Sequence, residues 1–303
     1  MEKVEIKRES DYIKYIEDAT TNYSRFLKLI YRGESKSNYD LLPSVYRKIK
    51  TEELVYPETG EIKPIYNSLY LNTCREFDII QDFMFDAASR ITTISINDTN
   101  DRMRWLEYAQ HFGVPTRLLD WTHNPLIALY FACKSEQGEG KVYILRANHY
   151  SQLTRPKNME HIEGQTIHDC VSNAIWGKKP CFPYPILTQP HYFDQRMISQ
   201  SSCFMVWGDI KAPLTDIVKE LEKEELGHML YEEENGDGSH SLVSKKDTAL
   251  LSLYIPEENK ITILRELDVL NINQSTVFPG LDGIGQTIEW RNRFHMSDLY
   301  NLI

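Results

Sequence analysis

The strongest constraint on the fold is an apolar stretch in the middle of the chain, Pro125–Cys133 (PLIALYFAC). Asn124 precedes it, and Asn is a favoured N-cap residue, while proline is well tolerated in the first turn of a helix. The stretch is apolar on nearly all sides, so we predict a helix buried in the centre of a core. A membrane-spanning helix needs about 20 apolar residues, so this stretch is too short to be one.

The segments around this helix predict a mixed α+β fold. The spacing of apolar residues predicts further helices over 11–22, 66–88, 101–112 and the segment from Ile261 to Leu270. Strands are expected over 25–31, 141–146, 203–207 and 249–255, and a loop over 114–123. Short strands separated by helices and long loops favour a small mixed or antiparallel sheet flanked by helices.

No internal repeat or linker divides the chain, so a single compact domain is expected over residues 1–303. Its core would span about 25–290, with surface insertions at 155–164 and 227–244. The net charge is −10, which does not favour non-specific binding to nucleic acid. The N-terminus has no apolar signal core, so we expect a cytoplasmic protein. The number of cysteines is odd and none form C-x-x-C, so reduced thiols and no metal site are expected.

The densest group of polar residues is Gln110–Thr122 (QHFGVPTRLLDWT), between the end of one predicted helix and the start of the next. A helix N-terminus attracts anions, and the Arg117 guanidinium offers donors that suit phosphate. Trp121 offers a flat face for stacking a ring. The alternative interpretation is structural: Arg117 pairs with Asp120 across the turn, His111 is a hydrogen-bonded core histidine, and Trp121 belongs to the core.

Two other segments carry candidate binding residues. Gly33 follows Arg32 at the end of the first long strand, where glycine lets a ligand or a backbone approach closely. A turn with a surface arginine is the alternative there. Arg196 and Gln200 lie just before another strand. The turn-rich segment Phe278–Gly283 is expected to dock the last helix.

Together these segments resemble the FRG domain, a family named for its F/Y-R-G motif, which is Tyr31-Arg32-Gly33 here. Gln110–Thr122 and the apolar helix after it resemble the central signature of the family. Leu42–Arg47, the R-x-x-x-Q-x-x-x-F pattern from Arg196 to Phe204, and the Phe278–Gly283 turn also match. The resemblance extends over about residues 25–290 and implies a bacterial or phage-associated protein.

The R-G pair at a strand end is in turn similar to the arginine that opens ADP-ribosyltransferase folds, where it holds a phosphate of NAD. This likeness implies an ADP-ribosyltransferase-like fold and NAD as substrate. It also implies ADP-ribosyl transfer or NAD hydrolysis, in a toxin or phage-defence role. The chain departs from the transferase pattern because no clear S-T-S element occurs and Gln200 lies where a glutamate is expected. Glu34 and Asp120 are the alternative carboxylates.

The resulting hypothesis assigns a role to each candidate residue. The catalytic set is His111 as general acid or base, Asp120 as a partner of His111 or of the acceptor, and Arg32 as a phosphate ligand. The ligand-binding set is Tyr31, Gly33, Gln110, Thr116, Arg117, Trp121, Arg196 and Gln200. The alternative is a non-catalytic nucleotide sensor or protein-interaction module, with the acidic loop 232–238 as a partner surface.

Overall fold

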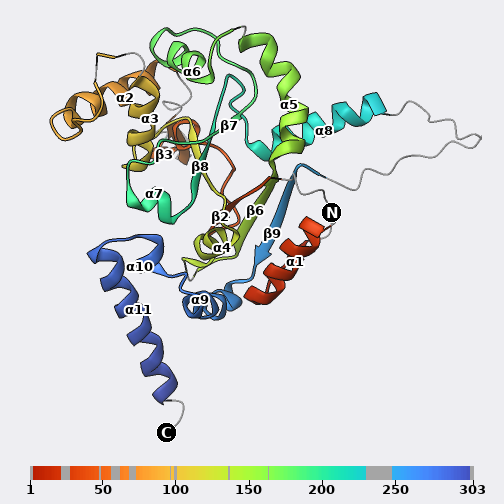
Figure 1. Ribbon diagram of the computed structural model, residues 1–303, viewed down its shortest axis with the longest axis vertical. Coiled ribbons are helices and arrows are strands. Elements are labelled where there is room, and N and C mark those ends of the chain that lie inside the picture. The colour runs from red at the N-terminus through yellow and green to blue at the C-terminus, as the bar shows by residue number, and fades with distance from the viewer. Residues whose placement is uncertain are drawn as a thin grey trace, which may run out of the picture.

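The centre of the protein is a seven-stranded sheet with the strand order β1-β9-β6-β2-β5-β8-β7 (Figure 1). The computed structural model describes residues 3–21, 28–47, 49–55, 62–67, 73–95, 97–98, 101–135, 137–162, 164–229 and 248–300. The strands of the sheet are β1 (Val4–Glu5), β2 (Leu29–Glu34), β5 (Leu118–Thr122), β6 (Gly140–Arg146), β7 (Ile186–Thr188), β8 (Ser202–Val206) and β9 (Leu250–Ile255). All neighbouring strands are antiparallel except β1 and β9. A separate antiparallel ribbon consists of β3 (Ile49–Val55) and β4 (Ile62–Asn67).

Helices cover both faces of the sheet. Those described are α1 (Glu9–Thr21), α2 (Thr73–Ala87), α3 (Arg102–His111), α4 (Pro125–Cys133), α5 (Ala147–Ile162), α6 (Ile167–Trp176), α7 (Gln195–Ser199), α8 (Leu214–Met229), α9 (Lys260–Val269), α10 (Gln274–Val277) and α11 (Leu281–Tyr300). The expected mixed fold with flanking helices is confirmed, as are the helices near 11–22, 101–112 and 261–270. The helix expected over 66–88 is shorter, because residues 62–67 form strand β4.

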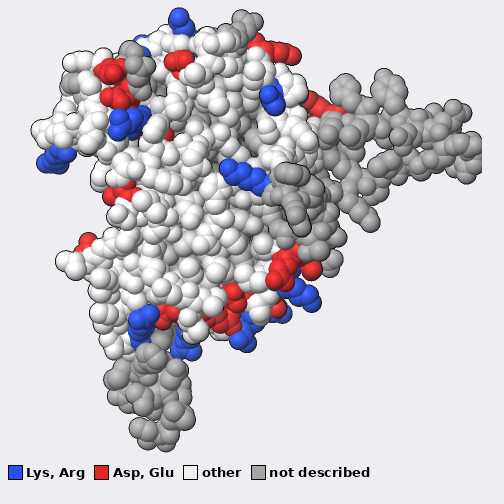
Figure 2. Space-filling model, viewed as in Figure 1, with Lys and Arg blue, Asp and Glu red and all other residues white. Residues whose placement is uncertain are grey.

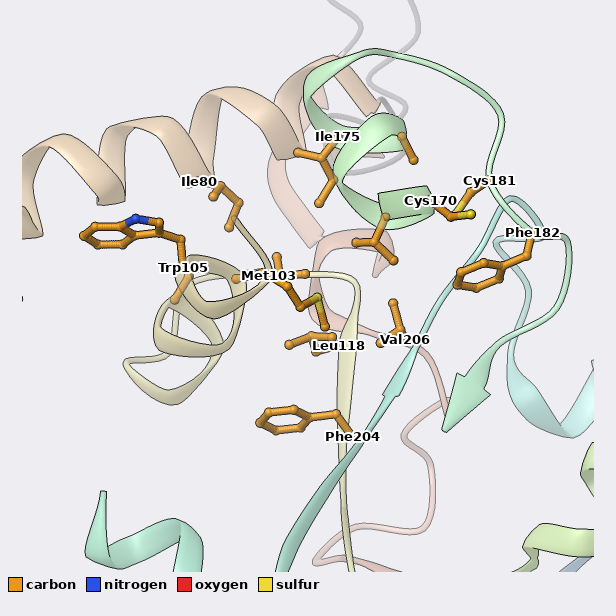
Figure 3. Close-up of a cluster of buried hydrophobic side chains, with 14 of the residues drawn as sticks. Ile80, Met103, Trp105, Leu118, Cys170, Ile175, Cys181, Phe182, Phe204 and Val206 are labelled. Atoms are coloured by element: carbon orange, nitrogen blue, oxygen red, sulfur yellow. The ribbon is translucent and has the colours of Figure 1, made fainter. Parts of the chain in front are cut away.

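The alternation of side chains along the strands separates two faces of the sheet. On one face, α1, α4 and α9 pack over β2, β6 and β9, and α2, α3 and α6 pack over β5 and β8. Figure 3 shows Leu118, Phe204 and Val206 directed from β5 and β8 into this second cluster. The opposite face is covered by α5, α8 and the segment around Leu41–Tyr46. The first face therefore has two separate apolar clusters, and the candidate site lies between them.

Helix α4 lies unusually close to the sheet. Its N-cap is Asn124, whose side chain accepts a hydrogen bond from the Leu126 amide at 2.9 Å, as predicted. A Cβ atom on Gly33 would come 1.8 Å from the Ala128 carbonyl oxygen, and one on Gly140 would come 2.3 Å from the Ala132 carbonyl oxygen. Only glycine at these two strand positions allows the helix backbone to lie where it does.

Three expectations about loops and strand ends are corrected. Residues 118–122, expected within a loop, form the interior strand β5, between β2 and β8. Arg32 and Gly33 lie within strand β2 and not at its end, because their pairing with β6 continues to Glu34. The insertion expected at 155–164 is largely the second half of helix α5. The insertion expected at 227–244 lies mostly outside the described residues, and the acidic loop 232–238 lies wholly outside them.

Charged residues are unevenly distributed on the surface. Figure 2 shows most Lys, Arg, Asp and Glu side chains of the visible face near its margins, with the two signs intermixed along the lower edge. Within the described residues, Cys133, Cys170, Cys181 and Cys203 are buried free thiols, and no helix is long and apolar enough to span a bilayer.

Candidate functional site

A cavity of about 250 Å³ lies between the two apolar clusters, on the face of the sheet that α4 covers. Its floor comes from β2, β5 and β8, and its walls come from the end of α3, from α4 and from α7 (Figure 1). The lining residues are Tyr31, Arg32, Gly33, Gln110, His111, Asp120, Trp121, Thr122, Ile127, Phe131, Arg196, Met197, Gln200, Ser202 and Phe204. The cavity thus brings together residues from three stretches that are far apart in the sequence, 31–33, 110–131 and 196–204.

The cavity exposes a carboxylate at the centre of the sheet. Asp120 is the exposed residue of β5, whereas its neighbours Leu119 and Trp121 are each 2% exposed. Strands β2 and β8 flank β5, so solvent reaches Asp120 from above the sheet. Strands β2 and β5 pair only at Tyr31 and Thr122. A carboxylate kept accessible in the middle of a sheet is uncommon for a structural residue and is typical of a functional site.

A chain of hydrogen bonds orients the Asp120 carboxylate. The Gln110 Nε2 atom donates to Asp120 Oδ2 at 2.8 Å, and Gln110 Oε1 accepts from the Thr116 hydroxyl at 2.5 Å. The Thr116 hydroxyl in turn accepts from the Leu118 amide at 3.1 Å. Thr116 is fully buried and does not line the cavity. Its expected contact with a ligand is therefore corrected: it fixes the orientation of the Gln110 amide instead.

Arg32 bridges the two strands where they separate. Its Nη1 atom donates to the Asp120 carbonyl oxygen at 2.6 Å, and its Nε atom donates to Glu34 Oε1 at 2.9 Å. The side chains of Arg32 and Glu34 are 17% and 5% exposed. Arg32 therefore borders the cavity as expected, but Glu34 partly neutralises its charge.

His111 contacts helix α7 from the end of α3. Its Nε2 atom lies 3.6 Å from Asp194 Oδ2, and the same Asp194 caps α7 by accepting from the Arg196 amide at 2.7 Å. Burial lowers the pKa of His111 below its usual value of 6.5, the Asp194 carboxylate opposes this shift, and Arg196 adds to it. The imidazole is consequently neutral at pH 7. Asp194, and not the expected Asp120, is its nearest carboxylate partner.

Two more predicted residues lie at helix α7, Arg196 within it and Gln200 as its C-cap. The Arg196 guanidinium lies over the Phe278 ring, with its central carbon 4.6 Å from the ring centroid. No carboxylate forms an ion pair with Arg196 in the described part of the chain. Gln200 Nε2 donates to the Val277 carbonyl oxygen at 3.1 Å, and the Gln200 carbonyl oxygen accepts from the Thr122 hydroxyl at 2.6 Å. These bonds tie α7 to the sheet and to α10.

Two members of the predicted binding set have structural roles. Arg117 is 1% exposed and donates to both carboxylate oxygens of the fully buried Glu76, at 2.6 to 3.0 Å. Trp121 borders the cavity, but its side chain belongs to the buried cluster on the opposite face, because successive residues of a strand point to opposite sides. The expectations that Arg117 binds phosphate and that Trp121 stacks a ring are both corrected.

Tyr31 and Gly33 also border the cavity, although Tyr31 is only 5% exposed and the close approach at Gly33 is made by α4. Two residues that contact the predicted set, Asp194 and Glu76, were not predicted from the sequence. Asp194 had a usable signal, because Asp directly before a short helix is a favoured N-cap. Among the described residues, no group of three or more His, Cys, Asp or Glu side chains could hold a metal ion.

Comparison with known proteins gives a match to one family model and no match to an individual protein. No curated protein and no solved structure matches the chain. The model of the FRG domain matches residues 27–141, a range that includes β2, Gln110–Thr122 and α4 but ends before Arg196 and Phe278. The match is thus shorter than the expected 25–290. The segment of this chain that matches the FRG domain, residues 27–141, supplies strands β2 and β5 of the cavity floor and two of its walls, α3 and α4.

Proposed function

We propose that the protein cleaves the bond between nicotinamide and ribose in NAD, transferring the ADP-ribosyl group to water or to an acceptor. The observation that carries the proposal is the accessible Asp120 carboxylate in a cavity that also holds Arg196. A pyridine nucleotide carries a positive ring and negative phosphates. A cavity with a carboxylate and an arginine that has no ion-pair partner among the described residues complements both charges.

The chemistry follows from these positions. When the bond between C1′ and the ring nitrogen breaks, its electron pair goes to nicotinamide, which leaves as a neutral molecule. Positive charge then develops on the ribose, and the Asp120 carboxylate stabilises it. A water molecule or an acceptor hydroxyl attacks C1′, and the neutral imidazole of His111 accepts its proton. Arg196 binds the phosphates.

The direct test is the release of nicotinamide from NAD, measured by chromatography. The Asp120→Asn variant keeps the shape of the side chain and removes its charge, so we expect the rate to fall about 100-fold to 1,000-fold. Asp216→Asn, at an exposed position on α8, is the matched control and should behave as wild type. Wild-type protein that releases no nicotinamide, alone or with candidate acceptors, would refute the proposal.

A cellular role follows from the same reaction. An enzyme that consumes NAD depletes its own cell, and this agrees with the toxin or phage-defence role that the family resemblance implies. Growth arrest on expression, relieved by Asp120→Asn and not by Asp216→Asn, is the expected result.

A second candidate function is a nucleotide sensor without turnover. The observation that favours it is the hydrogen bond from Gln110 to Asp120 Oδ2 at 2.8 Å, which already engages the carboxylate that would stabilise a ribosyl cation. Binding of NAD without release of nicotinamide would support this function.

A further inference from the structure

A second hollow lies beside the cavity. This groove, of about 420 Å³, is bounded by α4, α9, α10 and α11. Its lining includes Tyr130, Lys134, Leu264, Gln274 and Trp290. The Tyr130 hydroxyl donates a hydrogen bond to the Gln274 side chain. Asp268 also lines the groove, and its carboxylate accepts two hydrogen bonds from the Arg291 guanidinium, at 2.7 and 2.9 Å. The groove therefore combines aromatic surface with a lysine.

The groove and the cavity lie next to each other, and Phe278 contacts residues that line each of them. On α4, Phe131 lines the cavity and the adjacent Tyr130 lines the groove. The Phe278 ring packs edge-on against Phe131, with centroids 5.9 Å apart. Phe278 follows α10, whose Gln274 lines the groove and whose Val277 accepts the hydrogen bond from Gln200. In Figure 1, α7, α10 and α11 follow one another along one side of α4.

Two cations meet at this aromatic residue. Lys134 Nζ lies 4.2 Å from the centroid of the Phe278 ring, and the Arg196 guanidinium carbon lies 4.6 Å from the same centroid. Burial lowers the pKa of Lys134, and the charge of Arg196 lowers it further. Neither cation has an ion-pair partner among the residues that the structure describes. Two like charges against one ring repel each other, and an anion bound between them would relieve this repulsion.

The sizes of the two hollows add a second argument. The cavity of about 250 Å³ is smaller than the roughly 300–1,000 Å³ of ordinary small-molecule sites. A complete dinucleotide therefore needs space beyond this cavity. The groove provides the missing space on the other side of Phe278.

We propose that the protein binds a dinucleotide across Phe278, with the diphosphate held between Lys134 and Arg196. The nicotinamide ribose then occupies the cavity above Asp120, and the adenosine half lies in the groove against Trp290. The inference rests on the proposed function for the identity of the ligand. It adds a second site whose lining residues lie outside the range that the FRG domain model matches, except for Tyr130 on α4 and Lys134 at its C-cap.

The test is the binding of ADP-ribose and of ribose 5-phosphate, measured by isothermal titration calorimetry. The Lys134→Met variant keeps the aliphatic stem against Phe278 and removes the charge. We expect its Kd for ADP-ribose to rise about tenfold, because a charge-assisted contact to phosphate is lost. Its Kd for ribose 5-phosphate should stay within about twofold, since that ligand needs only the cavity. Arg196→Met should weaken the binding of both ligands.

Two matched variants complete the design. Lys134→Arg restores the charge and should bind ADP-ribose as wild type does. Lys219→Met removes an exposed lysine on α8 and should have no effect. The inference is overturned if wild type does not bind ADP-ribose, if Lys134→Met binds it unchanged, or if this variant weakens both ligands equally. These outcomes are independent of nicotinamide release, so a failure here and a failure of the proposed reaction are distinguishable.

Discussion

The side-chain amide of Gln110 donates a hydrogen bond to the carboxylate of Asp120 at 2.8 Å and is itself held by the Thr116 hydroxyl. The three residues form one unit, since Thr116 fixes which end of the Gln110 amide faces the carboxylate. The orientation of Asp120 is therefore set by a buried threonine that no ligand reaches.

The first prediction concerns this unit. Gln110→Ala should lower the rate of nicotinamide release about tenfold, because Asp120 loses a donor worth about 1 kcal/mol or more. Thr116→Val should lower it less, and the double variant should be no slower than Gln110→Ala, because both changes act through one hydrogen bond. Rates of the three variants measured at saturating NAD decide this, and additive effects would contradict it.

The second prediction concerns the buried ion pair of Arg117 and Glu76. Replacing one partner leaves the other charge buried without compensation, so Arg117→Met should lower the free energy of unfolding by about 3–5 kcal/mol. The double variant Arg117→Met with Glu76→Met should recover much of this loss. The free energy of unfolding of the single and double variants is measured by urea unfolding followed by circular dichroism. A loss in the double variant equal to the sum of the two single losses would show that the two residues do not act as a pair.

The third prediction concerns the contact between β2 and α4. Gly33→Ala places a methyl group against the Ala128 carbonyl oxygen, so we expect a destabilisation of about 1–3 kcal/mol or more. Gly285→Ala is the matched control, because no atom lies within 4 Å of the added Cβ. Since alanine favours helix, the control should raise the stability of α11 by about 0.5–1 kcal/mol. Equal thermal shifts in the two variants would argue against the close packing of α4.

The fourth prediction concerns pH. The pKa of His111 is lowered from 6.5 by burial, so its imidazole is neutral and able to accept a proton at pH 7. The kcat/KM for NAD should fall only as the pH drops below 6.5. The unfolded chain binds more protons than the folded protein in this range, so His111 also makes stability decrease as the pH falls through it.

Asp194→Asn sharpens this test. Asparagine still caps α7, but the carboxylate that raises the pKa of His111 is gone, so the acid limb of the pH profile should move to lower pH. Asp216→Asn should leave the limb in place. An acid limb that lies above pH 6.5 in wild type, or one that Asp194→Asn does not move, would exclude His111 as the base.

The parts of the fold that were predictable are those encoded locally. Helix α4 follows from a cap and a continuous apolar run, and most of the other helices follow from their spacing. Strand β5 was not predictable, because Asp120 and Thr122 face the cavity and interrupt the apolar pattern, while its pairing with β2 and β8 is long-range. The fold depends there on contacts that no local window contains.

The same distinction applies to the site. Gln110, His111 and Asp120 stand close together in the sequence, and the prediction that they belong to one cluster agrees with the cavity that they line. Arg117 lies in the same stretch of sequence and has the same kind of side chain as a phosphate-binding arginine. Its ion-pair partner Glu76 is 41 residues away, so the neighbouring sequence does not show that its charge is neutralised in the core. Trp121 was misassigned because a strand, and not a turn, sets its direction.

Gly33 and Gly140 fix the height of α4 above the sheet through contacts between backbones. The side chains that α4 turns toward the cavity, Ile127 and Phe131, are not part of these backbone contacts, which involve Ala128 and Ala132. Substitution of these two residues during evolution would change the shape of the cavity, while the backbone contacts between α4 and the sheet stay the same. Ligand preference in this architecture is therefore free to diverge faster than the architecture itself.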